Sequence, residues 1–223
     1  MANAWDLIKA GKFDQACAAA DQEHDQAGSI LPLRNKVLAL LNLAEYEQAA
    51  TLSNFVVQGN GGDTDRDYIF LGVAHWLQGQ ADEAINAWRQ ATRTDYTDAA
   101  GGVEAHLLLS YAGVRNDLPA LRRESILALE VLSRAPVAKN WPGPIASHVS
   151  GRINEADLRE SISLQPVLHA KQTCQAAFHA GVMNLLHHDD FAFQERMREA
   201  AAQGPFSLTK QEYYLALREV GNK

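Results

Sequence analysis

The chain has 223 residues, 47% of them hydrophobic, which is enough to bury a core as one domain or one continuous array. Lys and Arg number 20 against 27 Asp and Glu, and the net charge of −7 argues against general affinity for nucleic acid or anionic lipid. No segment approaches the ~20 apolar residues of a membrane helix and no export signal is visible, so we expect a cytoplasmic protein without a membrane partner.

The negative charge is concentrated in the first hundred residues. Residues 1–100 carry 14 carboxylates against 7 Lys or Arg, so residues 101–223 sum to zero. An acidic surface of this kind suits a basic partner. The two cysteines, Cys17 and Cys174, lie far apart and suggest no disulfide framework, which favours a reducing compartment.

A repeated pattern is clearest over residues 71–91. Its members are small, aromatic or turn-forming residues: Leu71, Gly72, His75, Gly79, Ala84, Trp88 and Ala91. Gly72 and Ala84 are small enough for two helices to cross closely, and Gly79 permits a tight turn between them. Trp88 fills the groove between successive helix pairs. The order resembles the signature of the tetratricopeptide repeat (TPR), a pair of antiparallel helices.

The pattern recurs on both sides of this segment. Its turn position falls in succession on Gly11, Ala44, Gly79 and the pair Asn116-Asp117, at spacings of 33, 35 and 37 residues. These spacings bracket the ~34-residue period of the TPR. We therefore predict an all-α fold, a TPR-like superhelix with about four antiparallel helix pairs over residues 1–133.

Residues 134–152 interrupt the array. Three prolines disfavour a long helix there, and Trp141 favours an ordered turn over a flexible linker, with a short helix after it. The third segment, residues 153–223, then predicts a short helix over residues 154–161 and a degenerate helix pair over residues 168–203.

The last helix is expected to cover the end of the stack. It begins with a capping box, in which Thr209 and Glu212 satisfy free backbone N–H groups, and it ends at Gly221. Its expected packing stripe is Tyr213, Tyr214, Leu217 and Val220.

Spaced residues across 140–220 carry a second resemblance. They are Trp141-Pro142, Gly151, Leu158, Ala177-Phe178-His179-Ala180-Gly181 and Glu212-Tyr213. Their order is similar to that in the C-terminal half of bacterial TPR lipoproteins related to new lipoprotein I, which implies a bacterial, adaptor-like protein. The chain lacks the lipid-attachment signal of those proteins, so the resemblance does not imply an envelope location.

Motifs for catalysis or metal binding are weak. The densest cluster of metal-ligand residue types, His187-His188-Asp189-Asp190, falls on an expected turn, where polar residues collect and adjacent side chains point apart. Cys174 precedes an Ala/Phe stripe typical of packed side chains. We therefore predict no catalytic residue, no metal and no cofactor. The alternative is a hydrolase that uses residues 187–190, or a thiol enzyme that uses Cys174.

TPR arrays bind partner segments on the concave surface formed by the first helix of each pair. The register of the family implies a set of inward-facing side chains: Trp5, Lys9, Arg34, Asn35, Leu38, Asn42, Arg66, Ile69, Val73, Trp76, His106 and Ser110. Trp and Arg are the residue types most enriched at binding hot spots. The strongest candidates are therefore Trp5, Arg34, Arg66 and Trp76.

The predicted function is a non-enzymatic TPR scaffold or adaptor that holds a partner protein in its concave groove. A narrower alternative is a cytoplasmic immunity protein, a small acidic inhibitor of a basic toxin made by the same bacterium. The sign of the net charge favours this alternative, because an acidic surface steers a basic partner towards itself.

Overall fold

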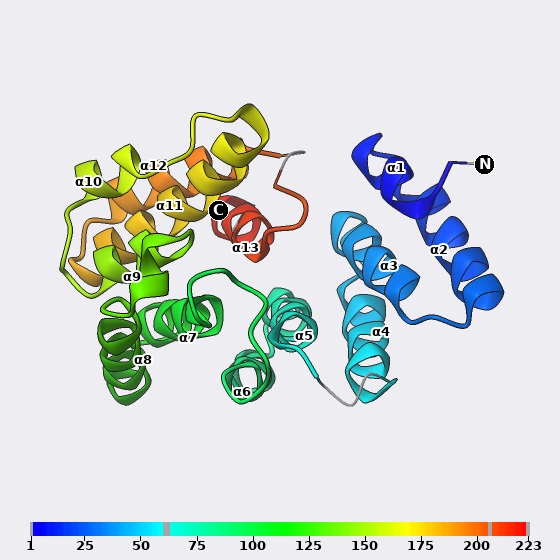
Figure 1. The fold of residues 1–223 in the computed structure, drawn as a ribbon, viewed down its shortest axis with the longest axis horizontal. Helices are drawn as coiled ribbons and strands as arrows, with labels where there is room; N and C mark the ends of the chain where they lie inside the picture. Colours follow the sequence, from blue (N-terminus) through cyan, green and yellow to red (C-terminus); the bar gives the residue numbers. More distant parts are fainter. Residues whose placement is uncertain (1, 60–62, 205–206, 222–223) are drawn as a thin grey trace. The chain divides into compact units, whose positions relative to one another are not determined.

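The computed structural model describes residues 2–59, 63–204 and 207–221, which form thirteen α-helices and one 3-10 helix, with no β-strand among them. The all-α prediction is confirmed. No helix among these residues is long and apolar enough to cross a lipid bilayer. Contacts divide the chain into two compact units, Met1–Asp95 and Tyr96–Lys223, whose helices are labelled in Figure 1. The boundary falls inside the segment that the repeat pattern predicts to be one array.

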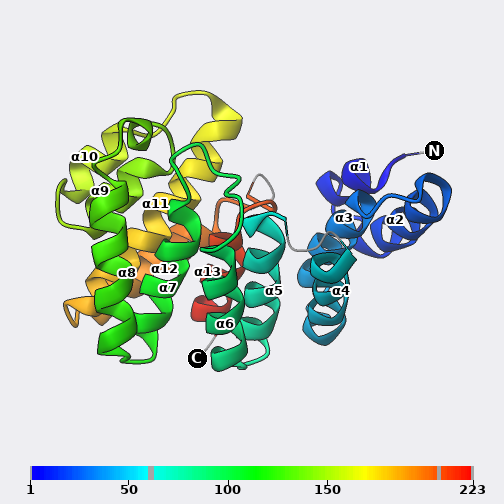
Figure 2. The same cartoon turned by 60° about the horizontal axis from the view of Figure 1, so that its bottom comes forward.

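Six helices make up the described part of the first unit: α1 (Ala4–Lys9), α2 (Phe13–Ala27), α3 (Leu31–Asn42), α4 (Tyr46–Gly59), α5 (Asp65–Leu77) and α6 (Ala81–Ala91). They pack as three successive hairpins, α1 with α2, α3 with α4 and α5 with α6 (Figure 2). Each hairpin turn has one residue in the left-handed region, with φ of 69° at Gly11, 59° at Ala44 and 82° at Gly79. A left-handed residue ends a helix and redirects the chain at once, so these three turns lie where the sequence predicts them.

The third hairpin shows why the repeat needs a small residue at position 72. A Cβ on Gly72 would lie 2.3 Å from Nε1 of Trp88, far inside normal contact distance. The Trp88 ring is fully buried, and its Nε1 donates a hydrogen bond to the backbone oxygen of Ile69 at 3.1 Å. The glycine therefore makes room for the tryptophan, and α5 and α6 cross closely around it.

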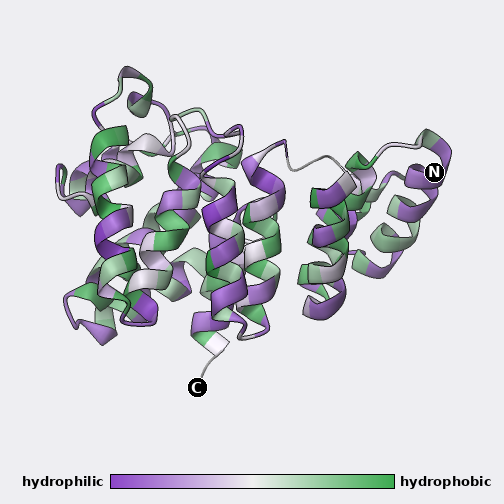
Figure 3. Cartoon of the chain, turned by 90° about the horizontal axis from the view of Figure 1, so that it is seen from below, coloured by the Kyte–Doolittle hydropathy of each residue, from purple (hydrophilic) through white to green (hydrophobic). Residues whose placement is uncertain are grey.

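Seven α-helices and the 3-10 helix make up the described part of the second unit: α7 (Val103–Arg115), α8 (Pro119–Leu132), η1 (Pro136–Lys139), α9 (Gly143–Val149), α10 (Glu155–Glu160), α11 (Pro166–Leu186), α12 (Asp190–Ala201) and α13 (Gln211–Gly221). α7 pairs with α8, and α11 pairs with α12. Their turns again contain left-handed residues, Asp117 with φ of 48° and His188 with φ of 61°. Both turns lie where the sequence predicts them. Figure 3 shows that hydrophobic and hydrophilic residues alternate around the helices of both units.

The proline-containing connection is ordered, as the sequence predicts. Trp141 packs against the core of the second unit, and its Nε1 donates a hydrogen bond to Oε1 of Gln175 on α11 at 2.7 Å. α9 follows directly and buries Ile145 in the same core. Asn154 caps α10 through a capping box with Asp157, which confirms the short helix predicted there.

The capping box predicted for the last helix is wrong. The Glu212 side chain is fully buried, and its Oε1 accepts hydrogen bonds from the side-chain amides of Gln175 and Gln211, each at 3.1 Å. The other carboxylate oxygen, Oε2, has no hydrogen-bond partner. Glu212 therefore lies inside the protein and does not reach back to Thr209.

The packing stripe predicted for α13 is also wrong in part. Tyr214 is buried, but Leu217 is 44% exposed. The buried face consists instead of Gln211, Glu212, Tyr214, Leu215, Ala216 and Glu219. Three of these are polar, so a search for an apolar stripe selects the wrong side of the helix.

A buried polar network fastens α13 and the residues before it to α7 and α11. Nε2 of Gln175 donates to Oε1 of Glu104 at 3.2 Å as well as to Glu212, and Nε2 of His179 lies 3.3 Å from Oε1 of Glu212. Nζ of Lys210 donates to Oε1 of Glu104 at 2.9 Å. Burial is the largest single influence and raises the pKa of Glu104, but the charge and hydrogen bond of Lys210, together with the hydrogen bonds of Gln175 and Gln211, hold that pKa below its usual value.

We expect Lys210→Met to lower the free energy of unfolding by about 3 kcal/mol at pH 7, because it leaves the buried Glu104 carboxylate without its cation. Burial then raises the pKa of Glu104 in the folded variant, so the deficit should shrink as the pH falls from 7 towards 4. In the wild type the folded-state pKa of Glu104 is lowered. Its pairing with Lys210 therefore stabilises the fold fully above the ordinary carboxyl pKa, and this stabilisation is lost as the pH falls through the lowered pKa. Urea unfolding at several pH values measures both effects.

Lys139→Met, at an exposed lysine of η1, is the control and should leave the stability within about 0.5 kcal/mol of the wild type. A deficit in Lys210→Met that does not change with pH would contradict this assignment of the Glu104 charge.

Candidate functional site

A pocket lies within the first unit among α3, α4 and α5. Its lining side chains are Arg34, Val37, Leu38, Ser53, Val56, Arg66, Asp67 and Phe70. The enclosed space is about 20 Å³, enough for one water-sized group. Three of the side chains that the sequence predicts to bind a partner, Arg34, Leu38 and Arg66, therefore meet at one place.

Helix periodicity explains why these residues share the pocket. The three lining residues of α3 lie at positions 34, 37 and 38, and those of α5 at 66, 67 and 70. Spacings of three and four residues put side chains on one face of a helix. Ser53 and Val56 occupy the matching face of α4, three residues apart. The hairpin turn at Ala44 brings α3 and α4 together, and α5 packs against α4, so the three faces meet.

Arg34 and Asp67 form a two-point ion pair at the pocket. Nε of Arg34 donates to Oδ1 of Asp67 at 2.8 Å, and Nη2 donates to Oδ2 at 2.6 Å. The Asp67 side chain is 3% exposed and the Arg34 side chain 26%. A bidentate pair of this kind fixes the guanidinium plane, so Arg34 is held in place between α3 and α5.

Arg66 contributes a more accessible positive charge. The side chain is exposed, and its Cζ lies 6.0 Å from the centre of the Phe70 ring. The guanidinium is thus within the range of a cation–π contact, and Phe70 keeps it at the pocket. Two arginines against one aspartate leave this pocket with a local excess of positive charge, although the unit around it is acidic.

Ser53 brings an unsatisfied polar group to the pocket. Its side chain is 2% exposed, and its Oγ has no hydrogen-bond partner within the described part of the chain. A buried hydroxyl without a partner costs free energy, whereas an oxygen or nitrogen atom entering the pocket could satisfy it. Ser53 is absent from the predicted binding residues because it lies on the second helix of its pair, whereas the predicted surface is formed by the first helices. Its spacing of three residues from Val56 is the signal that places both on one face.

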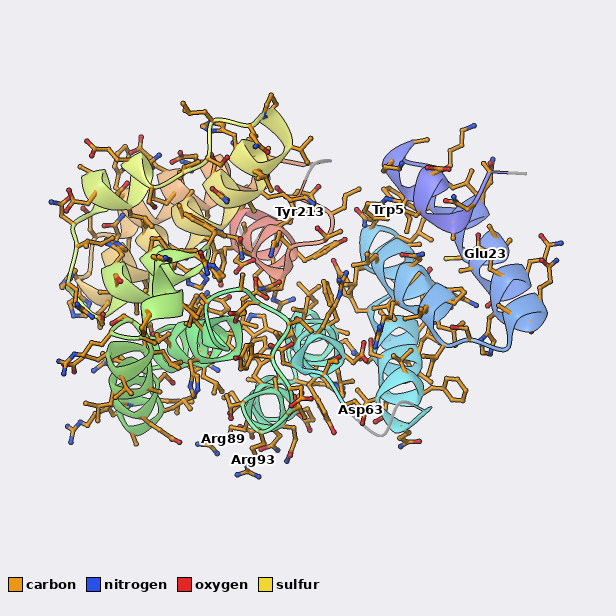
Figure 4. All side chains as sticks on the ribbon, viewed as in Figure 1. Trp5, Glu23, Asp63, Arg89, Arg93 and Tyr213 are labelled. Carbon is orange, nitrogen blue, oxygen red and sulfur yellow. The ribbon has the colours of Figure 1, made fainter. Side chains whose placement is uncertain are left out.

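The remaining predicted residues of the first unit lie outside the pocket. Asn35 is half-buried on α3, and Nδ2 of Asn42 donates to the backbone oxygen of Leu38 at 2.7 Å. Trp5 lies on α1 (Figure 4), with Nζ of Lys9 6.0 Å from its ring centre. Lys9 also pairs with Asp6 at 2.7 Å.

Several predicted contact residues are packed inside the protein. Leu38, Ile69, Val73 and Trp76 are each less than a tenth exposed. The Trp76 ring lies 5.5 Å from that of Trp88, centre to centre, in the core of the third hairpin. These side chains support the helix packing and offer little surface to a partner, so the sequence does not separate the exposed members of the inner face from the buried ones.

His106 and Ser110 belong to α7 in the second unit. Burial lowers the pKa of His106, against the opposing influence of Glu124. Ser110 is 2% exposed.

The residues considered for catalysis have other surroundings. Residues 187–190 are exposed at the turn between α11 and α12, and Asp189 caps α12 by accepting from the backbone N–H of Ala192 at 2.9 Å. Cys174 is fully buried, and burial raises the pKa of its thiol, which disfavours the reactive thiolate. Across residues 2–59, 63–204 and 207–221, no three His, Cys, Asp or Glu side chains are grouped to hold a metal ion.

In comparisons with known proteins, no family model and no curated protein matches the chain.

We expect Arg34→Gln to lower the free energy of unfolding by about 3 kcal/mol, because it removes the guanidinium from the buried carboxylate of Asp67. Arg66→Gln, at an exposed side chain one helix away, should change it by less than about 0.5 kcal/mol. Urea unfolding of both variants measures the difference. An equal decrease in the free energy of unfolding in both variants would contradict the assignment of Arg34 as a structural residue and Arg66 as an accessible one.

Proposed function

We propose that this protein is an interaction module of the TPR type, which holds a segment of a partner protein at the pocket among α3, α4 and α5. Support for the TPR relationship comes from the helix hairpins with left-handed turns at Gly11, Ala44 and Gly79, and from the close fit of Gly72 against Trp88. The similarity of the C-terminal half to bacterial TPR lipoproteins supports an adaptor role.

The observation that carries this proposal is the convergence of donors at one small pocket. Arg66 is exposed beside Phe70, Arg34 is fixed at the same place by Asp67, and the Ser53 hydroxyl lacks a partner. All three side chains donate hydrogen bonds, and Arg and aromatic residues are enriched at binding hot spots. A single acceptor atom of a partner, entering this water-sized space, would satisfy the Ser53 hydroxyl.

We expect Arg66→Glu to weaken capture of the partner by at least about tenfold. The substitution removes the accessible hydrogen-bond donor and puts in its place a carboxylate, which repels an acceptor group of the partner. The measurement is quantitative mass spectrometry of proteins that co-purify with the tagged full chain from cells that naturally make it.

Arg93→Glu is the matched control. Arg93 is exposed beyond the end of α6 and is not part of the pocket (Figure 4), and its replacement makes the same change in net charge. At least one protein should be recovered with the wild type and Arg93→Glu but lost with Arg66→Glu. Equal recovery with all three would refute the pocket as the binding site.

A second candidate function, immunity against a basic toxin, is favoured by the charges that follow the hairpin turns of the first unit. These turns lie between α1 and α2, between α3 and α4, and between α5 and α6. Exposed carboxylates follow every one of these turns, namely Asp14, Glu45, Glu47, Asp82 and Glu83. Acidic residues in a first helical turn also stabilise the helix, but a row of them adds a field that attracts a basic protein.

If the captured partner is a basic toxin, its association rate constant should fall by about tenfold or more between low and physiological salt. Replacing Asp82 and Glu83 by Asn and Gln should reduce that dependence, as stopped-flow fluorescence can measure. A captured partner with an acidic surface, or a rate that does not change with salt, would refute the immunity role and leave the adaptor role in place.

A further inference from the structure

A larger groove lies on the opposite face of the α3–α4 hairpin from the pocket. Its lining side chains are Lys36, Leu40, Glu47, Gln48, Thr51, Leu52 and Phe55, and its volume is about 490 Å³. On α3 the pocket uses positions 34, 37 and 38, whereas the groove uses 36 and 40. At 100° per residue these two sets point to opposite sides of the helix, so the groove is a separate surface.

The groove has an apolar centre. Leu40 is 5% exposed, Leu52 is half-buried, and Phe55 is 53% exposed. An aromatic side chain of this size usually buries its ring, and exposed aromatic residues are enriched at protein interfaces. Phe55 therefore provides an anchor that the fold of this unit does not cover.

The rim of the groove is acidic. Lys36 is neutralised by Asp21 of α2, with Nζ 2.7 Å from Oδ1 and 2.6 Å from Oδ2. Glu47 lines the groove and is exposed, and Glu45 lies beside it, accepting from Nε2 of Gln48 at 3.1 Å. Asp21, Glu45 and Glu47 thus give three negative charges at or beside the groove against the one positive charge of Lys36, and the excess charge is negative.

The groove follows the axis of α4. Its α4 residues fall at positions 47 and 48, then 51 and 52, then 55, which are three successive turns on one face. With a rise of ~1.5 Å per residue, these positions span about 12 Å, the length of about two turns of a second helix. A helix laid along α4 would place one apolar row on Leu40, Leu52 and Phe55.

We propose that this groove binds a basic amphipathic helix of a partner protein. Apolar side chains of that helix, spaced at three and four residues, fill the groove against Phe55, and its Lys or Arg side chains lie beside Glu47 and Glu45. The charge of the rim selects the basic partner, since an acidic helix would meet the like charges of Glu45 and Glu47. The groove does not share a side chain with the pocket, so this inference stands whether or not the pocket binds a partner.

The test uses the full chain and two labelled model peptides of about four helical turns, both with one leucine face. The other positions are lysines in one peptide and glutamates in the second. We expect the lysine peptide to bind at least about tenfold more tightly in fluorescence anisotropy at physiological salt. Methyl NMR should show shifts of the Leu40 and Leu52 signals when it binds.

Two pairs of variants locate the contact. Phe55→Ala should weaken binding of the lysine peptide by at least about tenfold. Phe191→Ala, at a phenylalanine that is 74% exposed on α12, should leave this binding unchanged. Glu47→Lys should weaken it similarly, whereas Glu83→Lys, at an exposed carboxylate in the first turn of α6, should have a smaller effect. Both phenylalanines are exposed, so neither alanine variant should alter the circular dichroism spectrum.

Equal binding of the two peptides, or full binding by Phe55→Ala, would overturn the inference. A wild type that dimerises in sedimentation experiments, and becomes monomeric on Phe55→Ala, would also overturn it, because the occupant would then be a second copy of the chain. Arg66→Glu should leave peptide binding unchanged, which separates a failure at this groove from a failure at the pocket.

Discussion

Reversal of the chain within a few residues is the constraint on which this all-helical architecture depends. Five hairpins meet it in the same way, with a left-handed residue at position 11, 44, 79, 117 or 188. Once the chain turns so sharply, the two helices must cross closely, and a small residue such as Gly72 has to face a large one such as Trp88. The pocket and the groove are both products of this packing, since each is lined by residues of α3 and α4, one helix hairpin.

Much of this fold could be predicted from the sequence because the repeat is a pattern of packing. Turn-forming and small residues at a period near 34 residues mark where helices end and cross. Each of these requirements concerns residues that are close in the sequence, so a sequence pattern reveals it. The same register placed Arg34 and Arg66 on the inner face, and the structure brings both to one pocket. The sequence does not predict which of the other inner-face residues are accessible to a partner.

The sequence could not show which polar residues are buried. Asp67 and Glu212 look like solvent-facing residues of amphipathic helices, yet the first is 3% exposed beside Arg34 and the second is fully buried beside Gln175 and His179. Arg34, Gln175 and His179 lie at least 33 residues away in the chain from the carboxylates that they contact, so no local pattern signals these pairings. For the same reason the repeat register predicts that Trp76 binds a partner, although it packs against Trp88. Burial depends on the whole unit, whereas periodicity reports only one helix.

The turns themselves show how little each hairpin requires of the sequence. Two of the five left-handed residues are glycines, and the others are Ala44, Asp117 and His188, which each tolerate a conformation that costs about 1 kcal/mol for a residue with a Cβ. Helix packing outweighs that cost, so mutation can remove a turn glycine without removing the hairpin. A chain built in this way can lose recognisable sequence similarity to its relatives during evolution while its backbone fold stays the same. The residues on its surfaces are then free to change, so that the same fold can bind different partners.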